Sequence, residues 1–167
     1  MRVAKKLNRD RVVRRARQTD IPALVRLYRD FVLHVQRRYD PTLEWSPRIR
    51  REFQRRIKSA IVNQRHAIFV AETSNRVVAF MWGHIIDGPW WRKKMKIAEG
   101  IIMFVEPKYR SQHIGHTLAN TFMSWARSSK ATRFQGQTDA KNTRALKLYR
   151  KLGWQPYLVS IEGILKK

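Results

Sequence analysis

The stretch from Ile101 to Trp154 constrains the fold more than any other, because it contains two patterns in a fixed order. The first is an apolar run, Ile101 to Val105, that ends at Pro107 and leads through a basic loop into a helical pattern. The second is a helical pattern, Asn142 to Gly153, that closes on its glycine. A strand that turns into a helix directs backbone N–H groups and the positive helix end to one place. The sequence therefore predicts an anion-binding loop between Arg110 and His116.

Together the two patterns resemble the GNAT superfamily of N-acetyltransferases. In that family an Arg-x-x-Gly-x-Gly loop follows a Val-x-Pro strand exit, and a later helix reads Asn-x-x-Ala-x-x-x-Tyr-x-x-x-Gly-Phe. In this chain His113 takes the first glycine position of the loop, Gly115 the second, and Trp154 the position of the closing Phe. The resemblance extends over nearly the whole chain, from about Arg11 to Leu165.

The resemblance implies one GNAT fold of the α/β (α+β) class. Its central sheet is expected to be mixed, mostly antiparallel, with about six to seven strands flanked by about four helices. Hydrophobic periodicity gives the order strand, two helices, three strands, helix, strand, helix, strand. The strands are expected at 11–17, 67–72, 76–86, 96–105, 132–138 and 157–165, and the helices at 21–39, 47–61, 112–128 and 141–152.

The length of 167 residues suits one domain, expected at 11–167 after a basic segment at 1–10. The absence of cysteine excludes disulfides and a cysteinyl acyl-enzyme, and the histidines have no metal-ligand spacing. No apolar run approaches the roughly 18 residues of a membrane helix, and no secretory signal is present. We therefore expect no metal, no membrane partner and a cytoplasmic location, with a virion or an organelle as alternatives.

The charge is the most unusual feature of the composition. Thirty-six Lys and Arg against 12 Asp and Glu give a formal net charge of +24. Such an excess attracts polyanions, so nucleic acid or a ribonucleoprotein is an expected partner. The arginine-rich helix at 47–61 is either a solvated surface or a nucleic-acid contact. The oligomeric state is left open.

The resemblance implies acetyl-CoA as the cofactor. The strand backbone at Met103 and Val105 would pair with the pantetheine arm, while N–H groups in the following loop hold the pyrophosphate. A side chain at His113 restricts positive φ and crowds the phosphate. Asn142 would cap its helix and hold the cofactor arm with the same amide. The expected cofactor contacts are Met103, Phe104, Val105, Arg110, Ser111, Gln112, His113, Ile114, Gly115, His116, Asn142, Ala145 and Tyr149.

Tyr149 occupies the position of the family's general acid. A neutral phenol of pKa ~10 can donate to a thiolate whose conjugate acid lies near ~8.5. The alternative is a core aromatic on the apolar face of its helix.

Glu99 is the expected general base. It stands six residues before Val105, as the base does in the histone-acetylating branch of the family, and it shares strand parity with Ile101 and Met103. A lysine-like amine of pKa ~10.4 needs such a base at neutral pH. The alternatives are an ion pair with an arginine or a residue facing solvent.

Four further side chains are assigned to the acceptor side or to the core. His84 could line the acceptor cleft. Trp45, Trp90 and Trp91 lie in segments that border the acceptor side in this family, and they are either a substrate rim or core fillers.

Three functions agree with these features. The preferred one is direct transfer of an acetyl group from acetyl-CoA to a primary amine on an anionic partner, such as aminoacyl-tRNA or a protein in a ribonucleoprotein. This acceptor is preferred because a chain at +24 repels polycations. The second is a structural GNAT-fold protein of little or no activity, associated with nucleic acid, a ribosome-like particle or a virion. The third is a small-molecule acetyltransferase for an anionic acceptor.

Overall fold

The computed structural model describes residues 11 to 163, so the predicted basic segment at 1–10 lies outside the described residues. Two compact units divide the chain, one ending at Gln137 and the other beginning at Thr138. Within the described part, no helix has the length and apolar character needed to cross a membrane.

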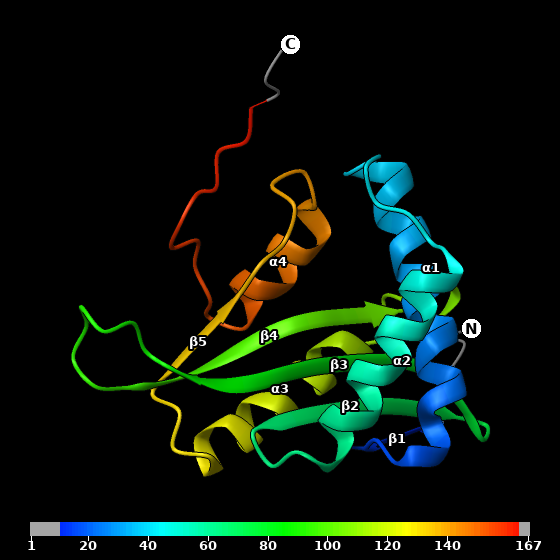
Figure 1. Cartoon of the computed structure of the whole chain (residues 1–167), viewed down its shortest axis with the longest axis horizontal. Helices are drawn as coiled ribbons and strands as arrows, with labels where there is room; N and C mark the ends of the chain where they lie inside the picture. Colours follow the sequence, from blue (N-terminus) through cyan, green and yellow to red (C-terminus); the bar gives the residue numbers. More distant parts are fainter. Residues whose placement is uncertain (1–10, 164–167) are drawn as a thin grey trace, which may run out of the picture. The chain divides into compact units, whose positions relative to one another are not determined.

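The first unit contains one open sheet, whose strands follow one another in space as they do in sequence (Figure 1). Neighbouring strands are antiparallel, except that β4 and β5 are parallel. The predicted mixed, mostly antiparallel sheet is therefore confirmed. The strands are β1 (Arg11–Arg15), β2 (His66–Thr73), β3 (Arg76–Asp87), β4 (Lys96–Val105) and β5 (Arg133–Gly136).

The sheet has five strands instead of the six to seven expected. The strand predicted at 157–165 is wrong in its described part, because residues 157 to 163 form no strand. A segment rich in β-branched and other apolar residues favours a strand, but a strand also needs a neighbour whose backbone is available.

The described residues contain four α-helices, as predicted, and two short 3-10 turns. The Ser46 hydroxyl accepts the Ile49 N–H at 3.4 Å and begins the second helix, and Pro47 occupies its first position, where no N–H is needed. The helices are α1 (Ile21–Arg38), α2 (Pro47–Val62), α3 (Ile114–Ser128) and α4 (Thr143–Lys151); the turns are η1 (Gln18–Asp20) and η2 (Pro107–Tyr109).

The first unit is layered, with α1 and α2 on one face of the sheet and α3 on the other (Figure 1). Alternation along β3 sends Phe80 and Trp82 into the buried cluster with Phe53 of α2. It sends Gly83 toward α3, where an added Cβ would lie 2.4 Å from the ring of Phe122. β3, which carries His84 of the site described below, is therefore covered by helices on both faces over most of its length.

The predicted hairpin turn between β2 and β3 is confirmed. Ser74 and Asn75 have φ of 48° and 57°, the positive values that a two-residue turn of type I′ requires.

An ion pair between Arg14 and the buried Asp20 connects β1 to η1 near the start of the first unit. Asp20 is 6% exposed, and its carboxylate accepts two hydrogen bonds from the Arg14 guanidinium at 2.8 and 3.0 Å. Arg14 also donates to Glu72, so three elements meet at one cation. The hydrogen bonds from Arg14 hold the pKa of Asp20 below its ordinary value of 3.8.

Asp20→Asn is expected to lower the free energy of unfolding by about 1.5–3 kcal/mol at pH 7, because the partly buried Arg14 guanidinium loses one of its two carboxylate partners and keeps only Glu72. A carboxylate whose folded pKa is lowered stabilises the fold above its unfolded pKa and loses this contribution as the pH falls through the folded pKa. The difference between variant and wild type should therefore shrink below pH 3.8. Urea unfolding across this range measures it, and a difference independent of pH would contradict it.

The second unit contains α4, which is capped at both ends by residues of its own segment. Asn142 accepts the Ala145 N–H at 3.1 Å through its side-chain oxygen, which is the predicted cap. At the other end Gly153 has φ of 77°, and the Trp154 N–H donates to the Tyr149 carbonyl at 2.9 Å. This is a Schellman ending, for which glycine is the favoured residue.

Candidate active site

The loop between η2 and α3 has alternating backbone conformations. Ser111 and His113 have φ of 61° and 62°, whereas Gln112 between them does not have a positive φ. Alternation between right-handed and left-handed backbone conformations turns successive N–H groups toward the same side and forms an anion-binding concavity. The chain therefore keeps the left-handed conformation at His113 without the glycine that normally permits it.

The N–H groups of this loop are available to a ligand. Among the described residues, none accepts a hydrogen bond from the backbone N–H groups of Gln112 to His116, and the first helical bond runs from Thr117 to the His113 carbonyl. The predicted anion-binding geometry is thus present in the backbone. The helix begins at Ile114 instead of the predicted Gln112, because a left-handed residue cannot continue a right-handed helix.

Two arginines hold the loop. Arg11 of β1 donates to the Gln112 carbonyl at 2.8 Å and to its side-chain oxygen at 2.6 Å, a contact that the sequence did not predict. The Arg110 Nε donates to the Val105 carbonyl at 2.9 Å, and its guanidinium lies 5.4 Å from the centre of the Phe104 ring. The Arg110 side chain therefore joins the end of β4 to the loop.

His113→Gly is expected to raise the free energy of unfolding by about 0.5–1 kcal/mol. Glycine removes the roughly 1–2 kcal/mol cost of a left-handed residue but adds entropy to the unfolded chain. His113→Ala is the matched control, because it removes the imidazole and keeps the Cβ that causes the strain. Urea unfolding compares the three proteins, and equal stabilisation by alanine would contradict the prediction.

The edge of β4 is open where the cofactor arm was predicted. β5 is a short strand, and all of it pairs with the first half of β4, over Ile97–Gly100. Within residues 11–163, no strand pairs with Ile101–Val105 on that side. An extended ligand can add to such an edge as a further strand would. Met103 and Val105 lie in this open segment.

A β-bulge in β4 corrects the predicted orientation of Glu99. Trp82 pairs with Ile102, but the next residue of β3, Gly83, pairs with Gly100, so that Ile101 is an extra residue. Glu99 consequently pairs with His84 and lies on the α1 and α2 face of the sheet. The expected shared parity of Glu99 with Met103 is wrong. An isolated glycine within a strand pattern indicates a bulge, so Gly100 was the available signal.

Glu99 is held by its two neighbouring strands. Its Oε2 lies 2.7 Å from the His84 Nε2, and its Oε1 accepts a hydrogen bond from Gln135 at 3.0 Å. Glu99 and His84 are one third and one quarter exposed, so both are reachable from solvent. The expected alternative of an arginine ion pair is not what the structure shows.

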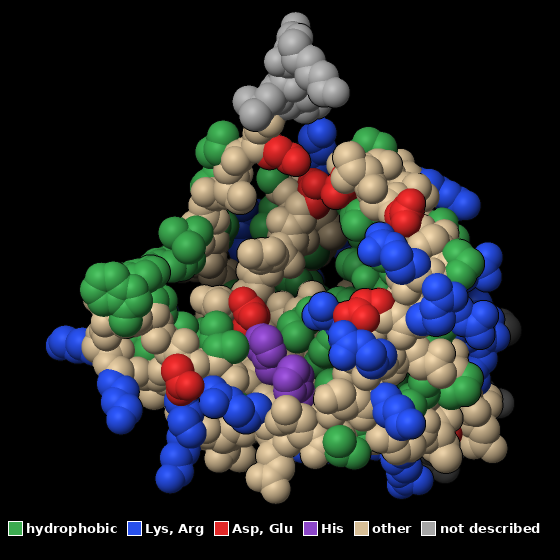
Figure 2. Space-filling view, in the orientation of Figure 1, with side chains coloured by type: hydrophobic (Ala, Val, Ile, Leu, Met, Phe, Trp, Pro, Cys, Tyr) green, Lys and Arg blue, Asp and Glu red, His purple; other side chains and the backbone are tan. Residues whose placement is uncertain are grey.

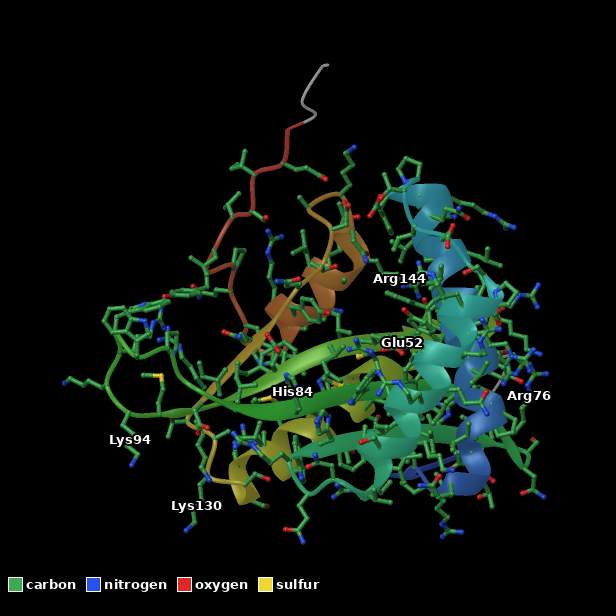
Figure 3. All side chains as sticks on the ribbon, in the orientation of Figure 1. Glu52, Arg76, His84, Lys94, Lys130 and Arg144 are labelled. Carbon is green, nitrogen blue, oxygen red and sulfur yellow. The ribbon has the colours of Figure 1, made fainter. Side chains whose placement is uncertain are left out.

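The polar row continues past His84 into β2. The ring of His66 lies 5.1 Å from that of His84, and its Nδ1 accepts the Trp82 indole N–H at 3.2 Å. Burial, followed by the charges of His84 and Arg65, lowers the pKa of His66, which therefore favours the neutral ring. Figure 2 shows the histidines beside a carboxylate on this face, and Figure 3 places His84 between Lys94 and Glu52.

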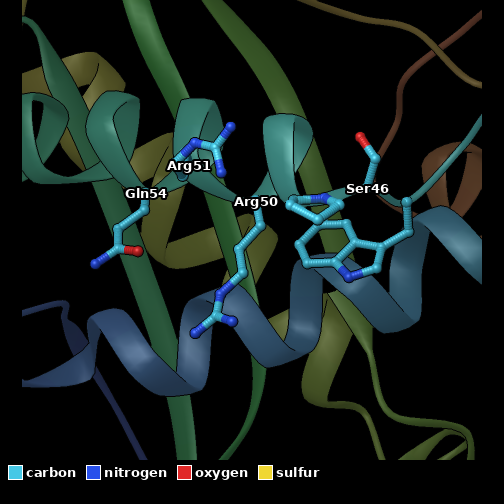
Figure 4. A pocket seen from close by; sticks show the side chains of 6 residues that line it. Ser46, Arg50, Arg51 and Gln54 are labelled. Carbon is cyan, nitrogen blue, oxygen red and sulfur yellow. The ribbon is translucent and has the colours of Figure 1, made fainter.

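The three tryptophans differ in their surroundings. Trp45 packs edge-on against Tyr28 and lines a shallow pocket of about 330 Å³ at the start of α2 (Figure 4). Trp90 and Trp91 are 91% and 68% exposed, so they do not fill the core. The pocket is completed by Ser46, Pro47, Arg50, Arg51 and Gln54.

The remaining predicted site residues belong to the second unit. Tyr149 lies on α4 with its ring 5.4 Å from that of Trp154, and burial raises the pKa of its phenol. Asn142 and Ala145 form the first turn of the same helix. In the part of the chain that is described, no cluster of three His, Asp or Glu side chains could hold a metal.

An open mixed sheet, a strand edge left unpaired and an N–H-rich loop before a helix are the backbone features that the resemblance to an acetyl-CoA-binding acyltransferase predicts. The chain belongs to the acetyltransferase (GNAT) family, whose model matches residues 24–154. Membership makes it an acetyl-CoA-dependent acetyltransferase, so the predicted family, cofactor and enzyme class are confirmed. Comparison with curated proteins finds no match.

Solved structures share the fold. A mutant of the BH1408 protein from Bacillus halodurans matches with a TM-score of 0.83 at 16% identity, over 93% of this chain and 99% of that chain. A predicted acetyltransferase from Clostridium acetobutylicum, solved with acetyl-CoA, gives 0.75 at 20% identity, over 92% and 96%. The aminoglycoside N-acetyltransferase AAC(6')-Iy, solved with a bisubstrate analogue, gives 0.74 at 14% identity, over 94% and 99%.

Proposed function

We propose that this acetyltransferase transfers the acetyl group directly to a primary amine on an anionic carrier, with aminoacyl-tRNA or a protein in a ribonucleoprotein as the preferred class. The observation that supports direct transfer most is the Glu99 carboxylate, which is held by His84 and Gln135 on the strand whose other half is open to the cofactor. A base and a thioester site on one strand suit attack by an amine.

The loop after η2 is proposed to bind the cofactor's pyrophosphate. The available N–H groups of Gln112 to His116 and the first turn of α3 would hold it, as helix N-termini hold phosphates. The His113 imidazole is exposed, and the backbone of His113 already has the left-handed conformation that a glycine would adopt easily. The open edge at Met103 and Val105 would take the pantetheine arm.

In the proposed reaction, one side chain would accept a proton from the amine and another would donate a proton to the leaving sulfur. Acetyl-CoA, when bound, supplies the thioester whose carbonyl carbon the amine attacks. Glu99 takes the proton from the ammonium and frees the lone pair that forms the C–N bond, while His84 and Gln135 hold its two oxygens. Tyr149 would give its phenol proton to sulfur as the C–S bond breaks, and the second nitrogen proton, lost as the amide forms, would restore the phenol; this role rests on its position in the family motif. An N–H of Met103 or Val105 donates to the carbonyl oxygen.

Charge supports the choice of acceptor. A polycationic amine needs several acidic side chains at its site, whereas the side chains that contact Glu99, those of His84 and Gln135, are not acidic. At +24 the chain attracts an amine that is attached to phosphates and repels a free polyamine or aminoglycoside. The aminoglycoside enzymes among the solved structures share the fold at about 15% identity, which does not extend to the acceptor.

Calorimetry and transfer assays test the proposal separately. Acetyl-CoA at 100 times its dissociation constant should stabilise the fold by about 2.7 kcal/mol. Labelled acetyl-CoA should then acetylate charged tRNA or a protein of a ribonucleoprotein extract, and not an aminoglycoside. Cofactor binding without transfer to either anionic acceptor would reject the acceptor class, and the absence of cofactor binding would reject the proposal as a whole.

A further inference from the structure

The loop between β3 and β4 presents two adjacent indoles to solvent. Trp90 and Trp91 are 91% and 68% exposed, and their rings lie edge to face with centroids 5.5 Å apart. An aromatic side chain buries a large area when it packs, so two that remain in water at one loop tip indicate a contact surface. We call residues 88–95 the tryptophan arm.

Positive charge surrounds the indoles. Arg92, Lys93 and Lys94 follow them directly, and Lys96 begins β4. The acid at the base of the arm, Asp87, forms an ion pair with Arg65 at 3.0 Å, and the hydrogen bond from Arg65 lowers the pKa of Asp87. Aromatic rings beside cations suit a ligand that carries both flat rings and negative charge.

A second basic surface lies on α2. Arg48, Arg51, Arg55 and Lys58 follow at intervals of three and four residues along its exposed side, a stripe about 15 Å long. Glu52 offsets part of this charge, because its carboxylate accepts hydrogen bonds from Arg55 and Arg56, which lower the pKa of Glu52 to about 2. We call these four cations the α2 stripe.

The two surfaces lie on either side of the polar row. In Figure 3 His84 lies between Lys94 of the arm and Glu52 of α2, and Figure 2 shows Lys and Arg side chains both next to the apolar tip and on the opposite side of the same face. A flat anionic membrane would meet the arm alone, whereas a flexible polymer can follow both surfaces. Unpaired bases stack on aromatic rings while phosphates pair with lysine and arginine.

We infer that the tryptophan arm binds single-stranded nucleic acid by stacking unpaired bases on Trp90 and Trp91, with the α2 stripe holding phosphates of the same strand. The inference deepens the proposed function and rests on it only for the amine that the strand would carry. Stacking is independent of base sequence, because every base has a π face.

Fluorescence anisotropy with a labelled single-stranded RNA of about 12 nucleotides tests it. Trp90→Ala/Trp91→Ala should bind at least about tenfold more weakly with an unchanged salt slope, because stacking is lost and no phosphate contact is removed. Trp90→Phe/Trp91→Phe should keep most of the affinity. Arg51→Gln/Lys58→Gln should reduce the slope of log affinity against log salt by about 1.4.

Binding to the duplex of the same sequence should not change in the tryptophan variants, since paired bases are not free to stack. Equal single-strand affinity of the alanine variant and wild type would overturn the inference. So would tryptophan-dependent binding to phosphatidylglycerol vesicles without any effect on RNA. Because these measurements contain no acetyl-CoA, they can fail while acetyl transfer succeeds, and the reverse outcome is equally distinguishable.

Discussion

Glu99→Gln is expected to lower kcat/KM at pH 7 by about 10²–10⁴-fold, the usual contribution of a positioned general base. The glutamine keeps the size of the side chain and can still contact His84 and Gln135, but it cannot take a proton. The variant should then act only on the fraction of acceptor that is already unprotonated. Its rate should rise with pH toward the pKa of the amine, and the gap to wild type should narrow there.

Steady-state rates across pH measure this effect, with acetyl-CoA affinity as the companion measurement. Gln135→Ala is the matched control, because it removes one hydrogen bond to Glu99 and leaves the carboxylate; it should cost far less activity. A uniform loss at all pH values, or a weaker cofactor, would contradict a role as base.

Tyr149→Phe is expected to lower kcat by about 10²-fold or more with little change in KM, because the sulfur would leave as an unprotonated thiolate. Burial raises the pKa of Tyr149, so its phenol stays neutral and able to donate throughout the neutral range. An acetyl donor with a much more acidic leaving group, such as p-nitrophenyl acetate, should lose far less rate in the variant.

Tyr28→Phe is the control for this experiment. Tyr28 also has a phenol whose pKa is raised by burial, and its ring stacks on Phe53 at 3.8 Å in the core of the first unit. Its substitution should leave kcat unchanged. Loss of activity with both acetyl donors in Tyr149→Phe would favour the alternative that Tyr149 is a packing residue.

The regular elements were predictable because the hydrophobic periodicity and the residues that begin and end each element agree. The strand at Lys96–Val105 was predicted with its observed bounds, and α2 was predicted from Pro47 onward. Both have strong local signals, an apolar run before a proline in the first and a capped amphipathic stripe in the second.

The polar row was not predictable, since its members come from different strands. His66, His84, Glu99 and Gln135 meet only through the register of β2 to β5. That register depends on one extra residue in β4, which composition does not reveal. The hydrogen bonds of Glu99 to His84 and Gln135 therefore required the structure.

The predicted strand at the end of the chain failed for a related reason. Tyr157, Leu158, Val159 and Ile161 are exposed in the second unit, although their pattern is typical of a strand. The side chains of this segment favour a strand, but the sequence cannot show whether the backbone of another strand is available to pair with it.

The extra residue in β4, Ile101, sets the face of the sheet on which the preceding side chains of that strand lie. A regular ladder without the bulge would pair Ile101 with Gly83 and Glu99 with Ile85, so that Glu99 would point to α3 and Gly100 would lie beside His84. The downstream segment, Ile102 to Val105, would keep its orientation. One unpaired residue therefore decides whether the Glu99 carboxylate lies beside His84 or faces α3.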